Sequence, residues 1–352
     1  MTDSSGFKFV LYPGPLRIGS TVWVVCPSSG VQPVCHRRLD IAIQNLRDKG
    51  FVVKEGKHVR NDTKHVSGTV EERLADLETA WQDDDCSLIF PPWGGELAIE
   101  LLGTLRLDHL RASRPKWIMG YSDTSTLLFA ISVSTGIATA HGLNLMEMVP
   151  NQMDDLSSNA LRALSSSGAE FTQLSSPTFQ DSWLSYEKFP EEPFRLTARS
   201  TIGLLKPSIA CSGITGRLLG GCIDTVSRLC GTRFGDVNKF CGNLSCTSLI
   251  LYLENAELSP CALLRALHNM ELAGWFEHVK CVLLGRNYAK AVDDKNAMSH
   301  HEVLTHFFSP YNFPVVHDAD IGHLPPQMTM INGAMANVTF SDGRLILKQT
   351  LC

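Results

Sequence analysis

The residues with the clearest capacity for chemistry lie in the segment Lys116–Thr126. An apolar run there leads into Gly120-Tyr121-Ser122-Asp123, and a helical pattern follows directly. A serine at a sharp strand-to-helix turn exposes its hydroxyl, and the free N–H groups at the start of the helix can stabilise an oxyanion. Thr124 stands where a Gly-x-Ser-x-Gly nucleophile elbow has its last glycine. Ser122 is therefore a candidate nucleophile, and the alternative is that Ser122 or Asp123 only caps the helix.

A second turn of interest, Trp93-Gly94-Gly95, follows a predicted strand over Ser87–Phe90. Paired glycines let backbone N–H groups approach a ligand closely. The carboxyl ends of parallel strands meet at one edge of a sheet, so this turn would lie beside Ser122 and Trp93 would contact substrate there. A tight turn without function is the alternative. No Gly-x-Gly-x-x-Gly and no Walker loop occurs, so we expect no cofactor.

A serine nucleophile needs a base, and the base needs a carboxylate that orients it. Among the twelve histidines, His323 lies in a loop between glycine and prolines, and His141 follows an apolar strand. Local context leaves these two nearly equal, and we expect His141 to be a pocket residue. Glu254 follows the predicted strand Leu249–Leu253, again at a carboxyl end, and Glu257 is the weaker candidate for the acid.

Metal ligation is the rival use of these residue types. No His-Glu-x-x-His sequence and no close group of His, Cys and Asp occurs along the chain. The runs Asp83–Asp85 and Asp293–Asp294 carry a single sign of charge, which is more typical of solvated loops than of metal sites. We therefore expect no metal.

The elements that must position these residues alternate in the first half of the chain. Strand signals and helical signals follow one another, which indicates βαβ units and a parallel sheet. The predicted strands are 21–26, 51–53, 87–90, 117–119 and 138–141, and the predicted helices are 37–49, 70–81, 96–105 and 124–134.

The second half of the chain has a different pattern of composition and predicted elements. Ser, Pro and Thr are dense within 151–207, which indicates a linker or substrate loop, and order returns from Gly216. Strands are predicted at 216–219, 248–253, 279–284 and 315–316, helices at 262–272 and 301–308, and a hairpin at 337–347. We expect an N-terminal α/β domain over 1–150, the linker over 151–207 and a C-terminal domain over 208–352.

Composition excludes several classes of protein. The 352 residues are 44% hydrophobic with a net charge of −5, so no broad basic field is expected for a nucleic-acid polymer or a membrane surface. The segment Met1–Lys8 is polar, and without a secretory signal the expected location is the cytoplasm. Eleven cysteines, an odd number without Cys-x-x-Cys, are expected to be reduced, structural thiols.

These motifs resemble the LD-carboxypeptidase family of serine peptidases over nearly the whole chain. Leu16–Ser29 is similar to the family's opening strand and Pro-Ser turn, and Arg114–Ser125 to its nucleophile signature. Leu251-Tyr-Leu-Glu254 and Gly322-His323 resemble the positions of its triad acid and base. The resemblance implies a Ser–Glu–His triad of Ser122, Glu254 and His323. The N–H groups of Asp123 and of Gly94 or Gly95 would then form the oxyanion hole.

The resemblance leans toward the branch of microcin C self-immunity carboxypeptidases. Asp181-Ser182-Trp183 is similar to that branch's loop tryptophan, which stacks on the nucleotide base of its substrate. A hydrophobic plug over the linker is the alternative for Trp183. The implied substrate is a small peptide, such as a muropeptide, or a peptidyl- or aminoacyl-nucleotide. A homodimer is also implied.

The element pattern and the resemblance together predict a Rossmann/flavodoxin-like parallel-sheet domain joined to a mixed, β-rich α/β domain. The active site is expected in the cleft between the two domains. Three positions depart from the family's pattern: Leu324-Pro325 replaces a polar pair, Ile331-Asn332-Gly333 replaces a common Pro-x-Gly, and Asn255 follows Glu254 where Asp or Thr is frequent. The altered loop of His323 motivates the alternative of a catalytically impaired small-molecule binding protein on the same scaffold. An unrelated α/β enzyme in which Ser122 is only a cap is the third hypothesis.

Overall fold

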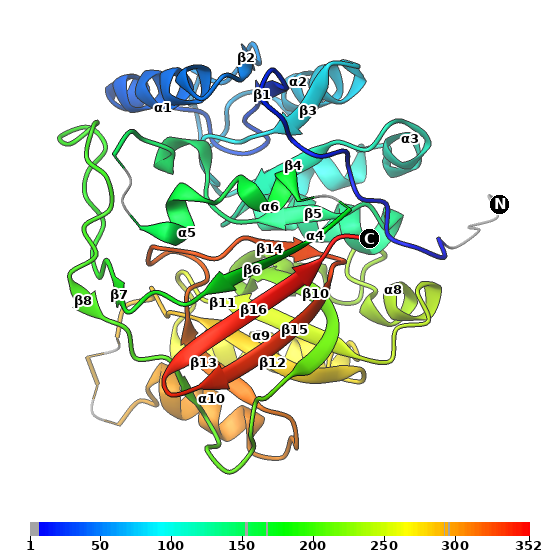
Figure 1. Ribbon diagram of the computed structural model, residues 1–352, viewed down its shortest axis with the longest axis vertical. Helices are drawn as coiled ribbons and strands as arrows, with labels where there is room; N and C mark the ends of the chain where they lie inside the picture. The colour runs from blue at the N-terminus through cyan, green and yellow to red at the C-terminus, as the bar shows by residue number, and fades with distance from the viewer. Residues whose placement is uncertain (1–6, 152–153, 167, 292, 295) are drawn as a thin grey trace.

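Two β-sheets, stacked one above the other, organise the molecule in the computed structural model (Figure 1). The structure describes residues 7–151, 154–166, 168–291, 293–294 and 296–352. Most of the polar start on which the expected location depends therefore lies outside the described residues. Within them, no helix combines the length and apolar character that crossing a membrane requires.

The first sheet has the strand order β14-β5-β4-β3-β1-β2, with β1 to β5 parallel. The order 2-1-3-4-5 is the doubly wound order of flavodoxin-like folds, in which ligands bind at the carboxyl ends of the strands. The strands are β1 Thr21–Val24, β2 Val52–Glu55, β3 Cys86–Ile89, β4 Trp117–Gly120, β5 Thr139–His141 and β14 Met330–Asn332. The helices of this half are α1 His36–Asp48, α2 Val70–Gln82, α3 Leu107–Ala112 and α4 Thr124–Thr135.

The sequence signals of this half correspond closely to the observed elements. Thr69 and Glu72 form a capping box at the start of α2, as the residue types favour. The predicted helix over 96–105 is instead a 3₁₀ helix, η2 Ala98–Gly103. Its entry is fixed by two side chains, because the Ser28 hydroxyl accepts from the Leu97 N–H and the Asp123 carboxylate accepts from the Ala98 N–H.

The second sheet has the order β6-β16-β15-β10-β11-β12-β13-β9, in which only β10 to β13 are parallel. The fold class is therefore confirmed: a parallel-sheet N-terminal domain and a mixed, β-rich C-terminal one. The strands are β6 Glu170–Leu174, β9 Gly203–Leu204, β10 Ile214–Cys222, β11 Leu249–Glu254, β12 Val279–Gly285, β13 Val315–Ala319, β15 Met335–Ser341 and β16 Arg344–Thr350. The helices are α7 Ile223–Val226, α8 Val237–Asn243, α9 Pro260–Leu272 and α10 His300–Phe308.

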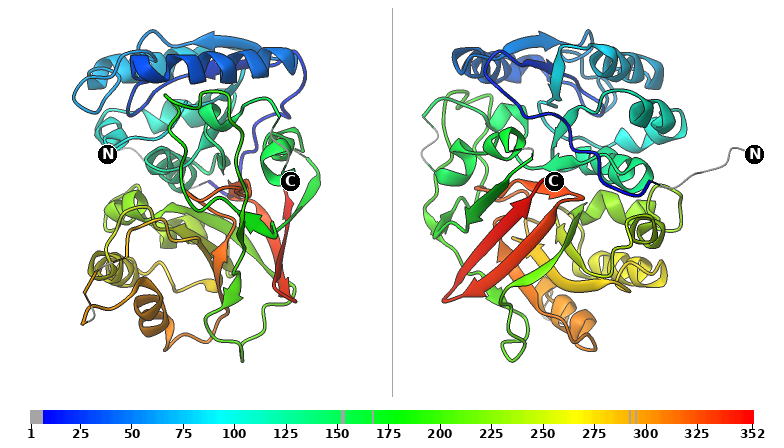
Figure 2. Two further views of the ribbon diagram at one scale, coloured as in Figure 1. Left: turned by 90° about the vertical axis from the view of Figure 1, so that its left-hand side faces the viewer. Right: turned by 45° about the vertical axis from the view of Figure 1, so that its right-hand side comes forward.

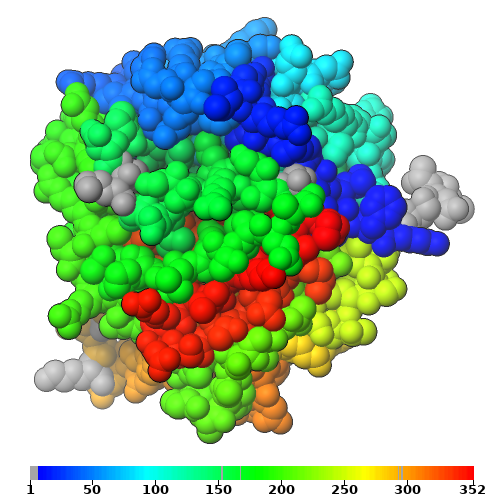
Figure 3. Space-filling model, viewed as in Figure 1, coloured from blue at the N-terminus to red at the C-terminus, as the bar shows by residue number. Residues whose placement is uncertain are grey.

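The segment 151–207 is more ordered than a linker composition suggests. It holds α5 Asp155–Ser158, α6 Arg162–Ser165, the small β7 Thr178–Phe179 and β8 Ala198–Arg199 pair, and two strands, β6 and β9, that form the edges of the second sheet. In Figure 3 this green segment runs across the surface beside the red C-terminal hairpin. The division into 1–150, 151–207 and 208–352 stays a prediction.

Helix α4 lies at the junction of the two sheets, which the side views of Figure 2 show one above the other. Its residues are buried on almost every side, as expected for an apolar helix with neighbours all round. The Phe129 ring stacks on Trp275 at 4.7 Å between ring centroids. The Ser125 hydroxyl accepts a hydrogen bond of 3.2 Å from the Cys222 N–H at the end of β10. The helix that starts beside Ser122 is thus anchored to both halves.

Candidate active site

Ser122 occupies the turn between β4 and α4 with a backbone φ of 60°. This left-handed conformation is uncommon for a residue other than glycine and is typical of functional turns. The neighbouring Asp123 fixes the turn, because its carboxylate accepts hydrogen bonds from the Ser28 hydroxyl (2.6 Å) and the Ala98 N–H (2.7 Å). Asp123 thus anchors the turn to the loop after β1 and to the start of η2.

The glycine turn after β3 lies directly against Ser122. A Cβ at Gly94 would stand 2.6 Å from the Cβ of Ser122 and 2.9 Å from the Asp123 nitrogen. Gly95 has a φ of 140°, and a Cβ there would collide with Ser28 and Ser29. The hydrogen bonds of the described residues leave the N–H groups of Asp123, Gly94 and Gly95 without a partner. These three donors can therefore serve a ligand oxygen.

Glu254 and His323 meet at the carboxyl ends of the second sheet's parallel strands. Glu254 ends β11, His323 lies in the loop after β13, and the His323 Nδ1 is 2.8 Å from the Glu254 carboxylate. Two glycines, Gly285 and Gly322, pack so tightly on Glu254 that a Cβ at either would collide with it. The alternative acid, Glu257, is exposed and forms no such contact.

Burial and the mutual attraction of Glu254 and His323 shift the pKa values of these two residues in opposite directions. Burial would raise the pKa of Glu254, but the charge and hydrogen bond of His323 outweigh it and hold that pKa below its usual value. Burial would likewise lower the pKa of His323, but the Glu254 carboxylate outweighs burial and raises that pKa above 6.5. The pair therefore favours a carboxylate beside an imidazole that protonates easily.

One pocket of about 400 Å³ brings these groups together. Ser122 lies on its floor with the glycine turn, and His323 reaches it from the other half of the molecule, although no hydrogen bond joins Ser122 to His323. The lining residues that carry charge or aromatic rings are Asp62, His65, Trp93, Glu96, Tyr121, Glu147, Trp183, Tyr186, Tyr288 and His323. Among the described residues that line the pocket there is no lysine and no arginine.

The pocket has aromatic walls that include both predicted tryptophans. The Trp183 indole N–H donates to the His323 carbonyl at 2.7 Å, which ties the segment 151–207 to the loop of the candidate base. Its ring also meets Tyr186 edge-on at 6.0 Å, so Trp183 both packs in the wall and faces the pocket. The Trp93 indole N–H donates to the Ser29 carbonyl at 3.2 Å.

His141 does not line the pocket, which corrects its prediction as a substrate-binding residue. Its side chain is completely buried behind Tyr121 and Tyr252, and neither ring nitrogen has a hydrogen-bond partner. Burial lowers the pKa of His141 to about 4. His141 is the last residue of the buried strand β5, and this position does not give its side chain access to the pocket.

Three further residues of the site escaped the sequence analysis. The Tyr121 hydroxyl donates to the buried Glu147 carboxylate at 2.6 Å, and the Tyr121 ring meets His323 edge-on at 4.9 Å. Tyr288 stacks on the other side of His323 at 5.8 Å. Burial raises the pKa of Glu147 to about 7. Only Glu147 had a local signal, because Asn144-x-x-Glu147 fits a capping box at the 3₁₀ helix η3 Leu145–Glu147.

In the described part of the chain, one group of side chains has the composition and spacing to hold a metal ion. The ligand atoms of Cys222, Glu254 and His323 lie within 4.8 Å of one another. The sequence separation of these residues gave no sign of this proximity. The sequence predicts only that Cys222, like the other cysteines, is a structural thiol, and all eleven cysteines are free thiols.

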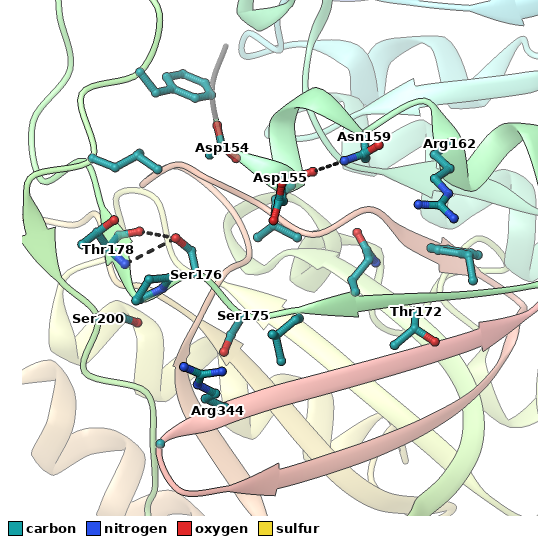
Figure 4. Close-up of a pocket in the computed structure, with 18 of the residues that line it drawn as sticks. Asp154, Asp155, Asn159, Arg162, Thr172, Ser175, Ser176, Thr178, Ser200 and Arg344 are labelled. Atoms are coloured by element: carbon teal, nitrogen blue, oxygen red, sulfur yellow. Dashed lines mark hydrogen bonds between the residues drawn. The ribbon is translucent and has the colours of Figure 1, made fainter.

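A larger pocket of about 1070 Å³ lies away from this site (Figure 4). It is lined by the α5–α6 region, β6 and the tip of the C-terminal hairpin. The labelled Asp155, Asn159 and Arg162 lie on one side of β6, with Arg344 on the other. None of the predicted site residues lines it.

Comparison with known proteins agrees with the arrangement of the two halves. A model of the LD-carboxypeptidase N-terminal domain matches residues 22–142, and a model of the LD-carboxypeptidase C-terminal domain matches residues 215–338. The chain belongs to the LD-carboxypeptidase family. Family membership supports a hydrolase of carboxypeptidase type.

Individual relatives of the family match along almost their full length. The chain is 26% identical to the probable murein peptide carboxypeptidase of Bacillus subtilis, over 97% of this chain and 96% of the relative. It is 24% identical to the microcin C7 self-immunity protein MccF of Escherichia coli, over 96% of each. A solved structure of MccF in complex with aspartyl sulfamoyl adenosine shares the fold with a TM-score of 0.82 at 24% identity, covering 97% of this chain and 99% of that one.

Proposed function

We propose that the protein is a serine-type carboxypeptidase or amidohydrolase that cleaves an amide near a free C-terminus with the triad Ser122, His323 and Glu254. One observation carries the proposal. His323, joined to the buried Glu254 at 2.8 Å, lines the same pocket as a serine held at a φ of 60° beside three unpartnered N–H groups. Nucleophile, base and oxyanion donors are the parts that acyl transfer requires.

In the proposed reaction, the Ser122 Oγ attacks the amide carbonyl and its proton passes to the His323 Nε2. Glu254 keeps the remaining ring proton on Nδ1 and stabilises the imidazolium. The N–H groups of Asp123 and of Gly94 or Gly95 hold the negative oxygen. His323 then protonates the leaving amine, the C–N bond breaks, and an acyl-enzyme remains. A water molecule, deprotonated by His323, releases the acid and restores Ser122.

The free protein lacks the Ser122–His323 hydrogen bond, and we expect it to form when substrate fills the pocket. Catalytic hydrogen bonds are often long or absent before substrate binds. The two residues come from different sheets and line the same pocket, so we expect an adjustment between the halves or a rotation of the serine side chain to join them.

The character of the pocket favours one substrate class. Four aromatic side chains, Trp93, Trp183, Tyr186 and Tyr288, offer faces for a planar base, and base stacking is worth about 1–3 kcal/mol. The lining carboxyl groups and the lack of a lysine or arginine suit a substrate with an ammonium group better than one held by several negative charges. MccF has been solved with aspartyl sulfamoyl adenosine, which joins an aminoacyl group to a nucleoside base. We propose an aminoacyl- or peptidyl-nucleotide as substrate, with a murein peptide as the second candidate.

The central test is hydrolysis of a small panel by the wild type and by Ser122→Ala. The panel contains aspartyl sulfamoyl adenosine and a tetrapeptide with a terminal D-residue, and mass spectrometry identifies the products. Ser122→Ala should lower turnover by about 10³-fold or more while ligand binding persists. Unchanged turnover would remove Ser122 from the mechanism. Tight binding by the wild type with the ligand recovered intact would favour a binding protein on this scaffold.

A second variant separates the two substrate classes. If Trp183 stacks on a base, Trp183→Ala should raise KM for the nucleotide substrate by roughly 5–150-fold, which is the loss of about 1–3 kcal/mol. The tetrapeptide, which has no base, should lose far less. Phe189→Ala, which removes an exposed aromatic ring of the same segment that does not line the pocket, is the matched control and should change neither KM. Equal losses for both substrates with Trp183→Ala would show that Trp183 only packs against the loop of His323.

Two further features stay predictions: a cytoplasmic location, and the homodimer that the family resemblance implies. Light scattering of the purified chain tests the second, and a monomeric mass at working concentration would contradict it.

A further inference from the structure

The cysteine that ends β10 lies beside the Glu254–His323 pair. In the parallel register of β10 and β11, Cys222 is the direct partner of Glu254, so the two side chains project on the same face of the sheet. The Cys222 sulfur, a Glu254 oxygen and a His323 ring nitrogen lie within 4.8 Å of one another. The cluster thus combines a sulfur, an oxygen and a nitrogen ligand around one point.

A second observation indicates that this cluster has room for a ligand. Glu254 is 1% exposed, its Oε2 accepts from His323, no N–H or O–H donor reaches its Oε1, and the Cys222 thiol contacts the same carboxylate. A buried carboxylate oxygen with only a weak thiol donor nearby is costly, and a bound cation would satisfy it. The thiol of Cys222, also 1% exposed, lies 3.5 Å from the Asp224 carboxylate, which adds a second negative group nearby.

We propose that Cys222, Glu254 and His323 form an inhibitory binding site for a borderline-soft divalent cation of the Zn²⁺ type. Cysteine sulfur, histidine nitrogen and carboxylate oxygen are the ligands that Zn²⁺ takes, whereas Mg²⁺ and Ca²⁺ require oxygen ligands. Ligand atoms in a tetrahedral zinc site are about 3–4 Å apart, so small side-chain rotations within the cluster suffice.

Charge and proton balance support the site. The thiol of Cys222 releases one proton on binding, and the thiolate and the carboxylate together neutralise the two positive charges of the cation. The buried cluster therefore carries no uncompensated charge, which low-dielectric surroundings would penalise. The cation can enter from the pocket, because the His323 side chain is 15% exposed there.

Binding would stop the proposed reaction, and this part of the inference rests on the proposed function. A cation on the His323 Nδ1 displaces the proton from that atom, and the neutral ring then carries its proton on Nε2. A protonated Nε2 cannot accept the proton of Ser122. Glu254, engaged by the cation, no longer orients the ring for catalysis. Inhibition should therefore reverse when a chelator removes the cation.

Direct binding tests the site without any substrate. Co²⁺ added to the wild-type protein should produce the thiolate-to-cobalt charge-transfer absorption of a cysteine ligand, and Zn²⁺ should abolish it by displacement. Cys222→Ser should lose this absorption and weaken Zn²⁺ binding at least tenfold in calorimetry. Cys261→Ser, which removes an exposed thiol, should change neither. If the wild type lacks the absorption, or if Cys222→Ser retains it, the site is refuted.

The functional experiment compares the hydrolytic activity of each variant in added cation with the activity of the same variant in chelator. Zn²⁺ should inhibit the wild type and Cys261→Ser, Cys222→Ser should resist it at least tenfold, and Mg²⁺ at the same concentration should have no effect. If Cys222→Ser does not fold, Cys222→Ala provides the same comparison. Because the cobalt spectrum needs no turnover, a failure of the proposed hydrolase activity leaves the binding result intact. Equal Zn²⁺ inhibition of wild type and Cys222→Ser would overturn the inhibitory role.

Discussion

At the scale of single residues, the central question is which protonation state the site favours. Only a neutral imidazole can accept the proton of Ser122. The Glu254 carboxylate, 2.8 Å from the Nδ1 of His323, stabilises the imidazolium and raises the pKa of His323 above 6.5, although burial acts the other way. The acid that orients the base therefore also makes the base easier to protonate.

This balance predicts the pH profile of hydrolysis. As pH falls through the raised pKa of His323, the neutral base is lost, so the acid limb of kcat/KM should have its midpoint above pH 6.5. Glu254→Gln removes the negative charge, and burial then lowers the pKa of His323, so the midpoint should move to lower pH while kcat also falls. A midpoint that stays in place in Glu254→Gln would show that the carboxylate does not set this pKa.

At the scale of elements, the position of His323 depends on a buried ion pair between two strand ends. Arg286 follows β12 and pairs with Asp320, which follows β13, and the two side chains are 3% and 0% exposed. The same guanidinium donates to the carbonyls of Leu324 and Pro326, on the far side of His323. One side chain thus holds both ends of the loop that carries the candidate base.

Arg286→Met should therefore damage stability and activity together. Removing one partner leaves Asp320 as an unpaired buried carboxylate, and we expect the free energy of unfolding to fall by about 3–5 kcal/mol. The loosened loop should also lower kcat/KM at temperatures where the variant is still folded. Urea unfolding and steady-state kinetics measure the two effects. Arg37→Met, which breaks an exposed pair with Glu191, is the control, with an expected cost of about 0–1 kcal/mol. Equal costs for both variants would contradict the role of Arg286.

The parts of the fold that the sequence predicted are those with local signals. Periodicity and flanking glycines predicted β1 to β5 and most of the long helices, and turn motifs predicted where Ser122 and the glycine turn lie. The strands β6, β9 and β14 are short and pair with partners far along the chain, so nothing local indicates them. The proximity of Cys222 to Glu254 follows from the register of β10 against β11, and the burial of His141 from the packing of Tyr121 above it. The residues adjacent in sequence predict neither the proximity of Cys222 to Glu254 nor the burial of His141.

At the scale of the whole molecule, the two sheets must hold their relative position, because Ser122 lies on one and Glu254 and His323 on the other. The strand β14 connects them. Its backbone pairs with β5 of the first sheet, while the buried Asn332 side chain accepts from the Gly220 N–H (3.0 Å) and the Tyr252 hydroxyl (2.8 Å) of the second. The same side chain donates to the Thr139 hydroxyl at 3.2 Å.

Asn332→Ala should uncouple the halves. It leaves the Gly220 N–H and the Tyr252 hydroxyl unpaired in the interior, at about 1–3 kcal/mol each, so the free energy of unfolding should fall by roughly 2–6 kcal/mol. Since the triad spans the junction, kcat should fall before the fold is lost on heating. Fluorescence and circular dichroism during urea unfolding measure stability and show whether the two halves still unfold together. Asn337→Ala, at a partly exposed position of β15, should cost no more than about 0.5 kcal/mol. If the two variants are equally stable, the junction is held by apolar packing around α4 and not by Asn332.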